Sequence, residues 1–324
     1  MFIWFMYQME EEIRSQSTSV RNAWESAHRK SSEIQDMASG AMGFVVSGSG
    51  TSFNASLFLS LLLNDSGRPA VPVAPSEVGT YIRSLGRNAI YVFFSQSGES
   101  RDTVRAAREA AESGARIISF TNSQESTLSK LSDLEIYLSV GPEKAVAATK
   151  SFTAMLMASL EFCSAIQGSC SEAVMRKVAA SVGQVVGQAE NLQVVSADNY
   201  IFLGSGYSYV TAREAALKLR ETASVRTEAF IAQEFEHGYI QVAGSKDAVV
   251  TFSEDQVTAR IREECTSFGA QVLDGSLGSQ VIRGFDYPER CVLEIIPWQL
   301  YAMRLAQSRG LNPDRPDRLT KVLR

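Results

Sequence analysis

The sequence contains one pattern twice, and this repetition limits the possible folds more than any other feature. GSGTSF at 48–53 follows an apolar run, and GSGYSY at 204–209, 156 residues later, follows another. The apolar runs 90–95 and 248–253 form a second pair, 158 residues apart. Because the two offsets agree within two residues, they indicate a tandem duplication. The chain is therefore expected to fold as two copies of one structural plan.

Each copy alternates strand-like and helix-like segments. Short apolar runs predict strands, and they lie at 44–46, 89–94, 116–120, 134–138, 200–203, 248–253 and 270–273. Helical periodicity lies between them, at 55–63, 103–113, 211–221 and 257–266. Strands that alternate with helices at this spacing predict βαβ units and parallel sheets. The sequence thus predicts an α/β protein built from two similar domains.

The expected organisation has four parts. They are an N-terminal segment at 1–25, a first domain at 26–170, a second domain at 171–305 and a C-terminal tail at 306–324. A long helical stretch from 152 to about 190 is expected to carry the chain from one copy to the other. The apolar opening, residues 1–6, is expected to be a short docking strand or a disordered start.

Charge and composition exclude several classes of function. The net charge is −5 at pH 7, so no basic surface for nucleic acid or an anionic membrane is expected. No stretch reaches the roughly 18 apolar residues that a membrane-spanning helix needs. The opening residues 1–6 lack the basic region of a signal peptide, and three glutamates follow at 10–12. These features predict a cytoplasmic protein that contacts neither membrane nor nucleic acid.

Metal and nucleotide cofactors are not expected either. The chain has two histidines, His28 and His237, which excludes a three-histidine zinc site. The four cysteines contain no C-x-x-C pair and fit a reducing compartment, where we expect them to be buried and inert. No Walker motif is present, and Phe53 replaces the third glycine of a dinucleotide fingerprint. The expected cofactor content is therefore none.

A candidate anion site follows the strand at 89–94. There SQSGES at 95–100 precedes a helical pattern, and a helix N-terminus supplies free N–H donors and a partial positive charge. Polar side chains that could hold a phosphate are Ser95, Gln96, Ser97 and Ser100, with Thr51 and Ser52 from the neighbouring turn. A hydroxyl-rich helix cap and turn would have the same composition. From spacing alone, the two interpretations are equally good.

The second copy differs at this turn. SEDQVT stands at 253–258, so the glycine is lost and two adjacent carboxylates occupy the turn. Because carboxylates repel an anion, we expect one anion site per chain, in the first copy.

Several separated motifs together resemble the sugar isomerase (SIS) domain family. They are GTSFN at 50–54, SQSGES at 95–100, Glu143 with VAATKSFT at 146–153, AALKLRE at 215–221, EAF at 228–230, EFEHG at 234–238, NPDRP at 312–316 and LTK at 319–321. In this order they are similar to the isomerase half of glutamine–fructose-6-phosphate amidotransferases and to glucosamine-6-phosphate deaminase-type proteins. The resemblance runs from about residue 10 to the end. It implies two tandem SIS domains, each a three-layer αβα sandwich of flavodoxin-like type, with the tail closing the site.

The resemblance also implies roles for individual residues. The polar side chains of the candidate anion site would bind the 6-phosphate of a sugar, and Gly50, Val146, Ala148 and Thr320 would lie near the sugar itself. Glu221 would move a proton between C1 and C2, and Lys321 would form an imine with the open-chain ketose. His237 would open the sugar ring from the partner subunit, which implies a homodimer. Each of these residues alone would be an ordinary surface or helix-end charge; their joint occurrence favours catalysis.

Departures from the family pattern affect the expected reaction. Ala148 and Asp317 stand where the synthases have serine and arginine, which leaves the exact substrate open. No glutaminase segment precedes the match, so the expected reaction is deamination of glucosamine 6-phosphate to fructose 6-phosphate and ammonia. The alternatives are a ketosamine-6-phosphate deglycase or aldose–ketose isomerase, and a non-catalytic sugar-phosphate-binding regulator. A regulator needs no base, histidine or lysine, so the presence of Glu221, His237 and Lys321 favours an enzyme.

Overall fold

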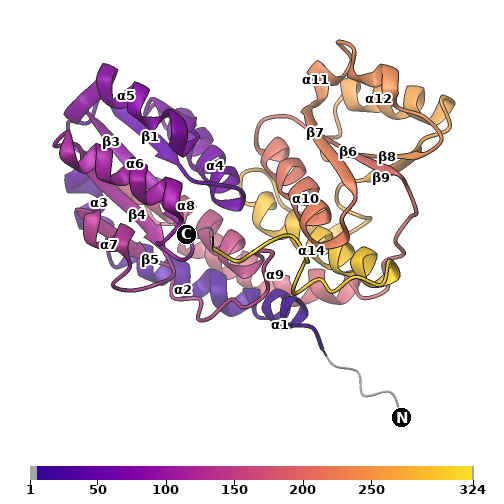
Figure 1. The fold of residues 1–324 in the computed structure, drawn as a ribbon, viewed down its shortest axis with the longest axis horizontal. Coiled ribbons are helices and arrows are strands. Elements are labelled where there is room, and N and C mark those ends of the chain that lie inside the picture. Colours follow the sequence, from indigo (N-terminus) through magenta and orange to yellow (C-terminus); the bar gives the residue numbers. More distant parts are fainter. Residues whose placement is uncertain (1–5, 323–324) are drawn as a thin grey trace. The chain divides into compact units, whose positions relative to one another are not determined.

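The computed structural model describes residues 6–322, which fold into two compact units (Figure 1). The first-sheet unit comprises Ser15–Glu143, Lys150–Ala179 and the tail from Lys321. The second-sheet unit comprises the described residues up to Arg14, Lys144–Thr149 and Ala180–Thr320. Most of the expected segment 1–6 lies outside the described residues.

The first sheet has five parallel strands in the order β2-β1-β3-β4-β5. Their bounds are β1 Gly43–Ser47, β2 Ala70–Val73, β3 Ala89–Ser95, β4 Arg116–Thr121 and β5 Leu134–Tyr137. This order is that of flavodoxin-like folds, as expected. The periodicity located four of the strands but missed β2, which is short, contains Pro72 and lies at the edge of the sheet.

Helices cover both faces of the first sheet (Figure 1). On one face Val45, Tyr91 and Ile117 pack with alanines of α6 (Arg101–Glu112) and with α5 (Val78–Leu85). On the other face Phe44 and Phe120 meet Phe162 of α8 (Lys150–Ile166) edge to face. Successive strand residues point to opposite faces, so these short apolar runs are buried on both sides. Further helices pack on α8: α4 (Thr51–Asp65), α2 (Gln16–His28) and α3 (Ser31–Ala38).

The second sheet repeats this plan with four parallel strands in the order β7-β6-β8-β9. They are β6 Asn199–Gly204, β7 Arg226–Ile231, β8 Asp247–Thr251 and β9 Gln271–Asp274. Ile201 and Val249 pack toward α11 (Ala232–Phe235) and α12 (Gln256–Ser267). Phe202 packs against Trp298 of α14 (Arg290–Ser308), the helix that lies beside α10 (Tyr207–Ala223). The remaining helices are α1 (Gln8–Arg14), α7 (Thr127–Leu131), α9 (Glu172–Ala189) and α13 (Gln280–Arg283).

The two glycine turns confirm the duplication at the level of the backbone. Gly50 and Gly206 precede α4 and α10 with φ/ψ of 59°/−124° and 56°/−124°. A Cβ on Gly48 would lie 2.7 Å from the backbone of Ser52, and one on Gly204 would lie 2.5 Å from the backbone of Ser208. Both turns therefore need glycine for the same two reasons, a positive φ and a close backbone contact.

The connecting region differs from the expectation in two ways. The stretch 152–190 is helical as expected but is interrupted, because α8 ends at Ile166 and α9 begins at Glu172, with Gly168 at a φ of 69° between them. Cys170 lies in this connection and is exposed, whereas Cys163, Cys265 and Cys291 are buried as expected.

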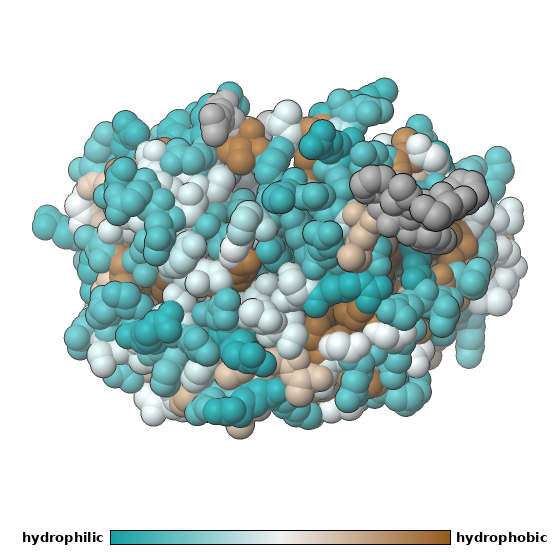
Figure 2. All heavy atoms as spheres, turned by 90° about the horizontal axis from the view of Figure 1, so that it is seen from below, coloured by the Kyte–Doolittle hydropathy of each residue, from teal (hydrophilic) through white to brown (hydrophobic). Residues whose placement is uncertain are grey.

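The face of the molecule in Figure 2 is mainly hydrophilic, with hydrophobic areas scattered among the polar ones. Among the described residues, none of the helices combines the length and the apolar composition needed to cross a membrane.

Candidate functional site

The turn at 95–100, here called the first hydroxyl turn, joins β3 to α6. Ser95 Oγ accepts a hydrogen bond from Gly98 N (3.1 Å) and lies 3.3 Å from Ser100 Oγ, and Ser97 Oγ accepts one from Glu99 N (3.1 Å). Gly98 has a φ of 66°, and a Cβ there would lie 2.1 Å from Ser126 Oγ. Only glycine fits this position, so the backbone of the turn is confined to one tight conformation. This conformation sets the positions of the hydroxyls.

A hollow of about 530 Å³ borders this turn. It is lined by Gln96, Ser97, Glu99, Asn122, Ser123, Gln124, Tyr137, Gly141, Pro142, Glu143 and Val322. Glu99 accepts hydrogen bonds from the N–H (2.8 Å) and the hydroxyl (2.9 Å) of Thr127, which fixes the turn against α7. Ser100 is the N-cap of α6, and its side chain makes no capping hydrogen bond. The first N–H groups of α6 are therefore available to an anion.

Thr51 and Ser52 begin α4, directly after Gly50. Strand β1 pairs with β3 in parallel, with Ser47 opposite Phe93, so both strands end at the same edge of the sheet. Because the carboxyl ends of parallel strands share one edge, the two turns emerge side by side there. The structure thus brings the expected phosphate-binding residues to one edge of the first sheet.

Lys321 is anchored in the same unit by an ion pair that the sequence analysis missed. Its Nζ donates to Glu143 Oε2 at 2.8 Å, and the lysine side chain is 23% exposed whereas the glutamate side chain is fully buried. Glu143 also accepts hydrogen bonds from Ser151 N (3.0 Å) and Ser151 Oγ (2.8 Å). Since Glu143 and Val322 line the hollow, Lys321 is held at its border. No sequence pattern links the two residues, because 178 positions separate them.

Glu221 lies near the C-terminal end of α10, in the second-sheet unit. Its Oε2 accepts from Lys218 Nζ at 2.5 Å, and Lys218 also lies 3.3 Å from Glu214 Oε1. Lys218 and Glu214 are fully buried, while Glu221 remains 22% exposed. A lysine three residues before the proposed base would be on the same helix face, and this spacing could have identified Lys218. The arrangement holds the Glu221 carboxylate in one orientation.

His237 is exposed and follows α11 in the second-sheet unit. Its backbone N–H donates to the carbonyl of Glu234 (3.0 Å). The neighbouring Glu236 pairs with Arg260 at 2.6 Å, which fixes the backbone next to the histidine. The supply of His237 from a partner subunit remains a prediction.

The segment Lys144–Thr149 carries two of the expected sugar-binding residues. Val146 N donates to the carbonyl of Asp314 (3.0 Å), and Ala148 is half-buried. The Asp314 carboxylate in turn accepts from Gln8 N and Met9 N, both at 2.9 Å. Thr320 is exposed. These residues belong to the second-sheet unit with Glu221 and His237, whereas Lys321 and the first hydroxyl turn belong to the first-sheet unit.

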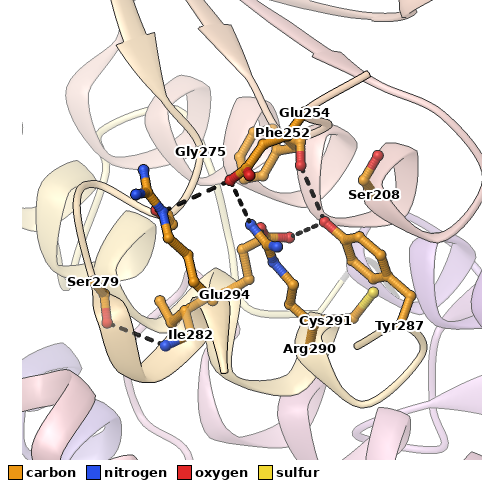
Figure 3. A network of polar contacts seen from close by, with 12 residues as sticks. Ser208, Phe252, Glu254, Gly275, Ser279, Ile282, Tyr287, Arg290, Cys291 and Glu294 are labelled. Carbon is orange, nitrogen blue, oxygen red and sulfur yellow. Dashed lines mark hydrogen bonds and ion pairs between the residues drawn. The ribbon is translucent and has the colours of Figure 1, made fainter. Parts of the chain in front are cut away.

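The equivalent turn of the second copy is occupied by the chain's own side chains (Figure 3). Asp255 Oδ1 accepts from Thr258 N (2.8 Å) and caps α12. Glu254 Oε1 lies 3.7 Å from Arg283 Nε and 3.8 Å from Arg290 Nη2. The Glu254 carboxylate thus lies near two guanidinium groups, which the sequence analysis did not foresee.

A buried network lies beneath Glu254 (Figure 3). Arg290 Nε donates to Glu294 Oε1 (2.9 Å), and Tyr287 Oη lies 2.9 Å from Glu294 Oε2 and 3.2 Å from the carbonyl of Phe252. Burial raises the pKa of Glu294 to about 7, against the opposing effects of Arg290 and Tyr287. The second turn is therefore a structural ion-pair network.

Comparisons with known proteins agree with this geometry. A family model for the SIS domain matches residues 42–163 and 193–282. The glutamine–fructose-6-phosphate aminotransferase (isomerizing) of Sulfurisphaera tokodaii is 34% identical over 294 residues, 86% of this chain and 49% of that protein. That of Sulfolobus acidocaldarius is 32% identical over 296 residues, with the same coverage of 86% and 49%. The chain thus spans about half the length of these curated relatives.

Two solved structures share the fold over nearly the whole chain. Glucosamine-6-phosphate deaminase from Thermotoga maritima has a TM-score of 0.81 at 24% identity, covering 98% of this chain and 99% of that one. Tagatose-6-phosphate ketose/aldose isomerase from Escherichia coli also has a TM-score of 0.81, at 20% identity, covering 96% and 95%. At these identities the likeness establishes the two-sheet α/β architecture.

Proposed function

The chain belongs to the SIS domain family, and from this premise we propose that it is a phosphosugar-converting enzyme acting on a hexose 6-phosphate amino sugar. The favoured reaction is deamination of glucosamine 6-phosphate to fructose 6-phosphate and ammonia. The names of the relatives support this substrate class, since they pair fructose 6-phosphate or glucosamine 6-phosphate with amino-group chemistry.

One observation carries the proposal. Gln96, Ser97 and Glu99 of the first hydroxyl turn line a hollow of about 530 Å³ together with Glu143, the partner of Lys321, and α6 begins directly after this turn. Hydroxyls and helix N–H groups suit a phosphate dianion. An amine held nearby suits imine formation with a sugar carbonyl. A site that only binds a sugar phosphate would need the hydroxyls and helix N–H groups but not the amine.

The proposed chemistry balances with water as the only co-reactant. In the open-chain aldehyde form of the amino sugar, Glu221 takes the proton from C2 and returns it to C1, while the ammonium group gives one proton to the aldehyde oxygen, which produces an iminium at C2 and a hydroxymethyl group at C1. Lys321 adds to C2 and ammonia leaves, giving a lysine imine. Water then hydrolyses this imine and releases fructose 6-phosphate and the free lysine. His237 is assigned to proton transfer during ring opening.

The Glu143 carboxylate fits a positioning role in this sequence. It accepts hydrogen bonds from Ser151 as well as from Lys321, so its place is fixed before substrate arrives. A lysine whose Nζ donates to such an acceptor keeps a defined direction for attack.

The experiment is a coupled assay of the purified chain with glucosamine 6-phosphate, scoring ammonia and fructose 6-phosphate together. Equimolar products support the deaminase. Interconversion of aldose and ketose phosphates without ammonia would replace it by an isomerase, and ammonia or amine release only from a substituted ketosamine phosphate would replace it by a deglycase. Sugar-phosphate binding without turnover of any of these substrates would overturn the enzyme and leave a binding protein.

A chemical trap tests the lysine directly. Incubation with fructose 6-phosphate and borohydride should reduce the imine and add the mass of the reduced sugar phosphate to the peptide that contains Lys321. The variant Lys321→Arg should show no adduct, and Lys246→Arg, at an exposed lysine, should label like the unmodified chain. Labelling that persists in Lys321→Arg would contradict the assignment.

A further inference from the structure

A second cluster of chemistry-bearing side chains lies in the first-sheet unit, among residues for which the proposed function has no role. His28 ends α2, Glu161 lies in α8, and Cys170 lies in the exposed connection between α8 and α9. His28 Nδ1 is 2.7 Å from Glu161 Oε1 and 3.9 Å from Cys170 Sγ. The three donor atoms all lie within 4.8 Å of one another. One imidazole, one carboxylate and one thiol therefore face a common point.

The two oxygens of Glu161 have different surroundings. Oε2 accepts hydrogen bonds from Trp24 Nε1 (2.8 Å), Ser171 N (3.0 Å) and Ser171 Oγ (2.6 Å). Oε1 faces His28. The Glu161 side chain is fully buried, so these donors fix its direction. One oxygen is held by the protein, and the other is presented toward the imidazole and the thiol.

The other two donors are oriented by packing. The His28 ring stacks on Trp24, with ring centroids 4.6 Å apart and planes 12° from parallel. The two hydrogen bonds from Ser171 to Glu161 hold the residue that follows Cys170. In metal sites, the residues that bind the ion are characteristically held in place by further hydrogen bonds and packing contacts of this kind. The His28 side chain is 46% exposed and Cys170 is exposed, so an ion can reach the cluster from solvent.

We propose that His28, Glu161 and Cys170 form a binding site for a divalent transition-metal ion, with Zn²⁺ as the ion that best fits the donors. Nitrogen, oxygen and sulfur ligands are those of zinc, and three protein ligands leave a fourth position for water. A thiolate, a carboxylate and a neutral imidazole balance the charge of Zn²⁺. Ligands in a tetrahedral zinc site lie roughly 3.3–3.6 Å apart, so the two separations from His28 need to change by about half an ångström and the Glu161–Cys170 separation by at most about 1.3 Å.

The expected consequence is structural. Such an ion would join the end of α2, the middle of α8 and the α8–α9 connection, three segments that are far apart in sequence. If Zn²⁺ binds the folded chain and not the unfolded one, the free energy of unfolding should rise with the logarithm of the zinc concentration. The site uses none of the residues assigned to sugar chemistry.

The test is metal binding by the full chain after treatment with a chelator. Co²⁺ serves as the probe, because coordination by a thiolate produces a charge-transfer absorption band that carboxylate or imidazole ligands do not, and Zn²⁺ should displace it at one equivalent. We expect Cys170→Ser to abolish the band and to weaken Zn²⁺ binding at least about tenfold, measured against a competing chromophoric chelator. His28→Gln should weaken it to a similar extent.

Ser169→Ala is the matched control, since it alters the neighbouring residue and leaves all three ligands in place; it should bind Zn²⁺ like the unmodified chain. Because Cys170 and His28 are exposed, both test variants should fold, which circular dichroism checks. No stoichiometric Zn²⁺ binding by the unmodified chain would overturn the proposal. Binding that persists unchanged in Cys170→Ser and His28→Gln would overturn it equally.

Discussion

The turns after β3 and β8 arose from one pattern but have opposite surroundings. After β3, hydroxyls and a glycine with positive φ border an open hollow. After β8, Glu254 meets Arg283 and Arg290, Asp255 caps the helix, and Tyr287 and Glu294 occupy the space beneath (Figure 3). After β8 the chain's own Asp255 caps the helix N-terminus, whereas after β3 no side chain caps α6, which leaves its first N–H groups for the proposed phosphate.

The same comparison separates two kinds of polar residue. The polar groups of the first hydroxyl turn should affect ligand binding and turnover with little effect on stability. Those of the second turn should affect stability alone, since Asp255 and Glu254 contact groups of the same unit. Four experiments test this division, in decreasing order of expected effect.

The largest effect is expected for Lys321→Gln. Loss of the amine should reduce turnover roughly 10³-fold, in the range of a lost catalytic group, while the glutamine amide can still donate to Glu143. Steady-state kinetics and calorimetric binding of fructose 6-phosphate check this: turnover should fall and binding should stay. Lys246→Gln, at an exposed lysine, is the control and should behave like the unmodified chain. Normal turnover in Lys321→Gln would remove the lysine from the mechanism.

The next effect concerns the second turn. Arg290→Gln leaves the buried Glu294 without its cation, so the free energy of unfolding should fall by about 3 kcal/mol. Urea denaturation measures this, and fructose 6-phosphate affinity should not change. Arg283→Gln, at a more exposed arginine, should cost about 0.5 kcal/mol or less. A large loss of affinity in Arg290→Gln would show that the second turn also binds ligand.

A pH effect of intermediate size is expected from Glu294. Its pKa of about 7 in the folded chain lies above the usual value of 4.5, so the unfolded chain releases this proton first as pH rises. Between about pH 5 and pH 7 this group should therefore lower the free energy of unfolding by about 2 kcal/mol, and its stabilising contribution is complete only below pH 4.5. Glu294→Gln should remove that part of the slope in urea titrations at each pH. An unchanged pH dependence of the free energy of unfolding in Glu294→Gln would show that another group is responsible for it.

The smallest effect is expected for Ser97→Ala. Loss of one hydroxyl donor to a phosphate should weaken fructose 6-phosphate binding about tenfold, the value of one hydrogen bond to a charged group. Ser253→Ala in the second turn is the matched control and should leave the affinity unchanged. Equal affinities for fructose and fructose 6-phosphate in the unmodified chain would show that the first hydroxyl turn does not recognise phosphate.

The elements of the fold that could be predicted are those that local sequence patterns specify. The apolar runs located β1, β3, β4, β5, β6, β8 and β9. Among these, β3, β6 and β8 are buried almost throughout, and strands buried on both faces leave continuous hydrophobic sequence. The edge strand β7 was missed, since RTEAFI begins with three polar residues and only its second residue is buried. The break between α8 and α9 was also missed: the apolar periodicity continues on both sides of it, and the exposed residues around Gly168 are few.

The candidate site was predictable only in its local elements. SQSGES at 95–100 identified the first hydroxyl turn, because a strand, a glycine turn and a helix start are adjacent in sequence. The partners of the charged residues were not predictable: Glu143 holds Lys321 across 178 positions, and Arg290 approaches Glu254 from another helix. Charge pairing carries no fixed sequence spacing outside a helix, so no pattern could have revealed these contacts.

By itself, the sequence determined the two parallel-sheet copies and the glycine turns, because periodicity and backbone conformation depend on neighbouring residues. The carboxylates of SEDQVT already indicated that only the first of the two equivalent turns can take an anion. The tertiary structure alone decided that Arg283 and Arg290 lie beside Glu254. It also decided that His28, Glu161 and Cys170 meet, although 133 positions separate the first two. The physical reason is the same in both cases: burial and ion pairing depend on which distant side chains the fold brings within a few ångströms.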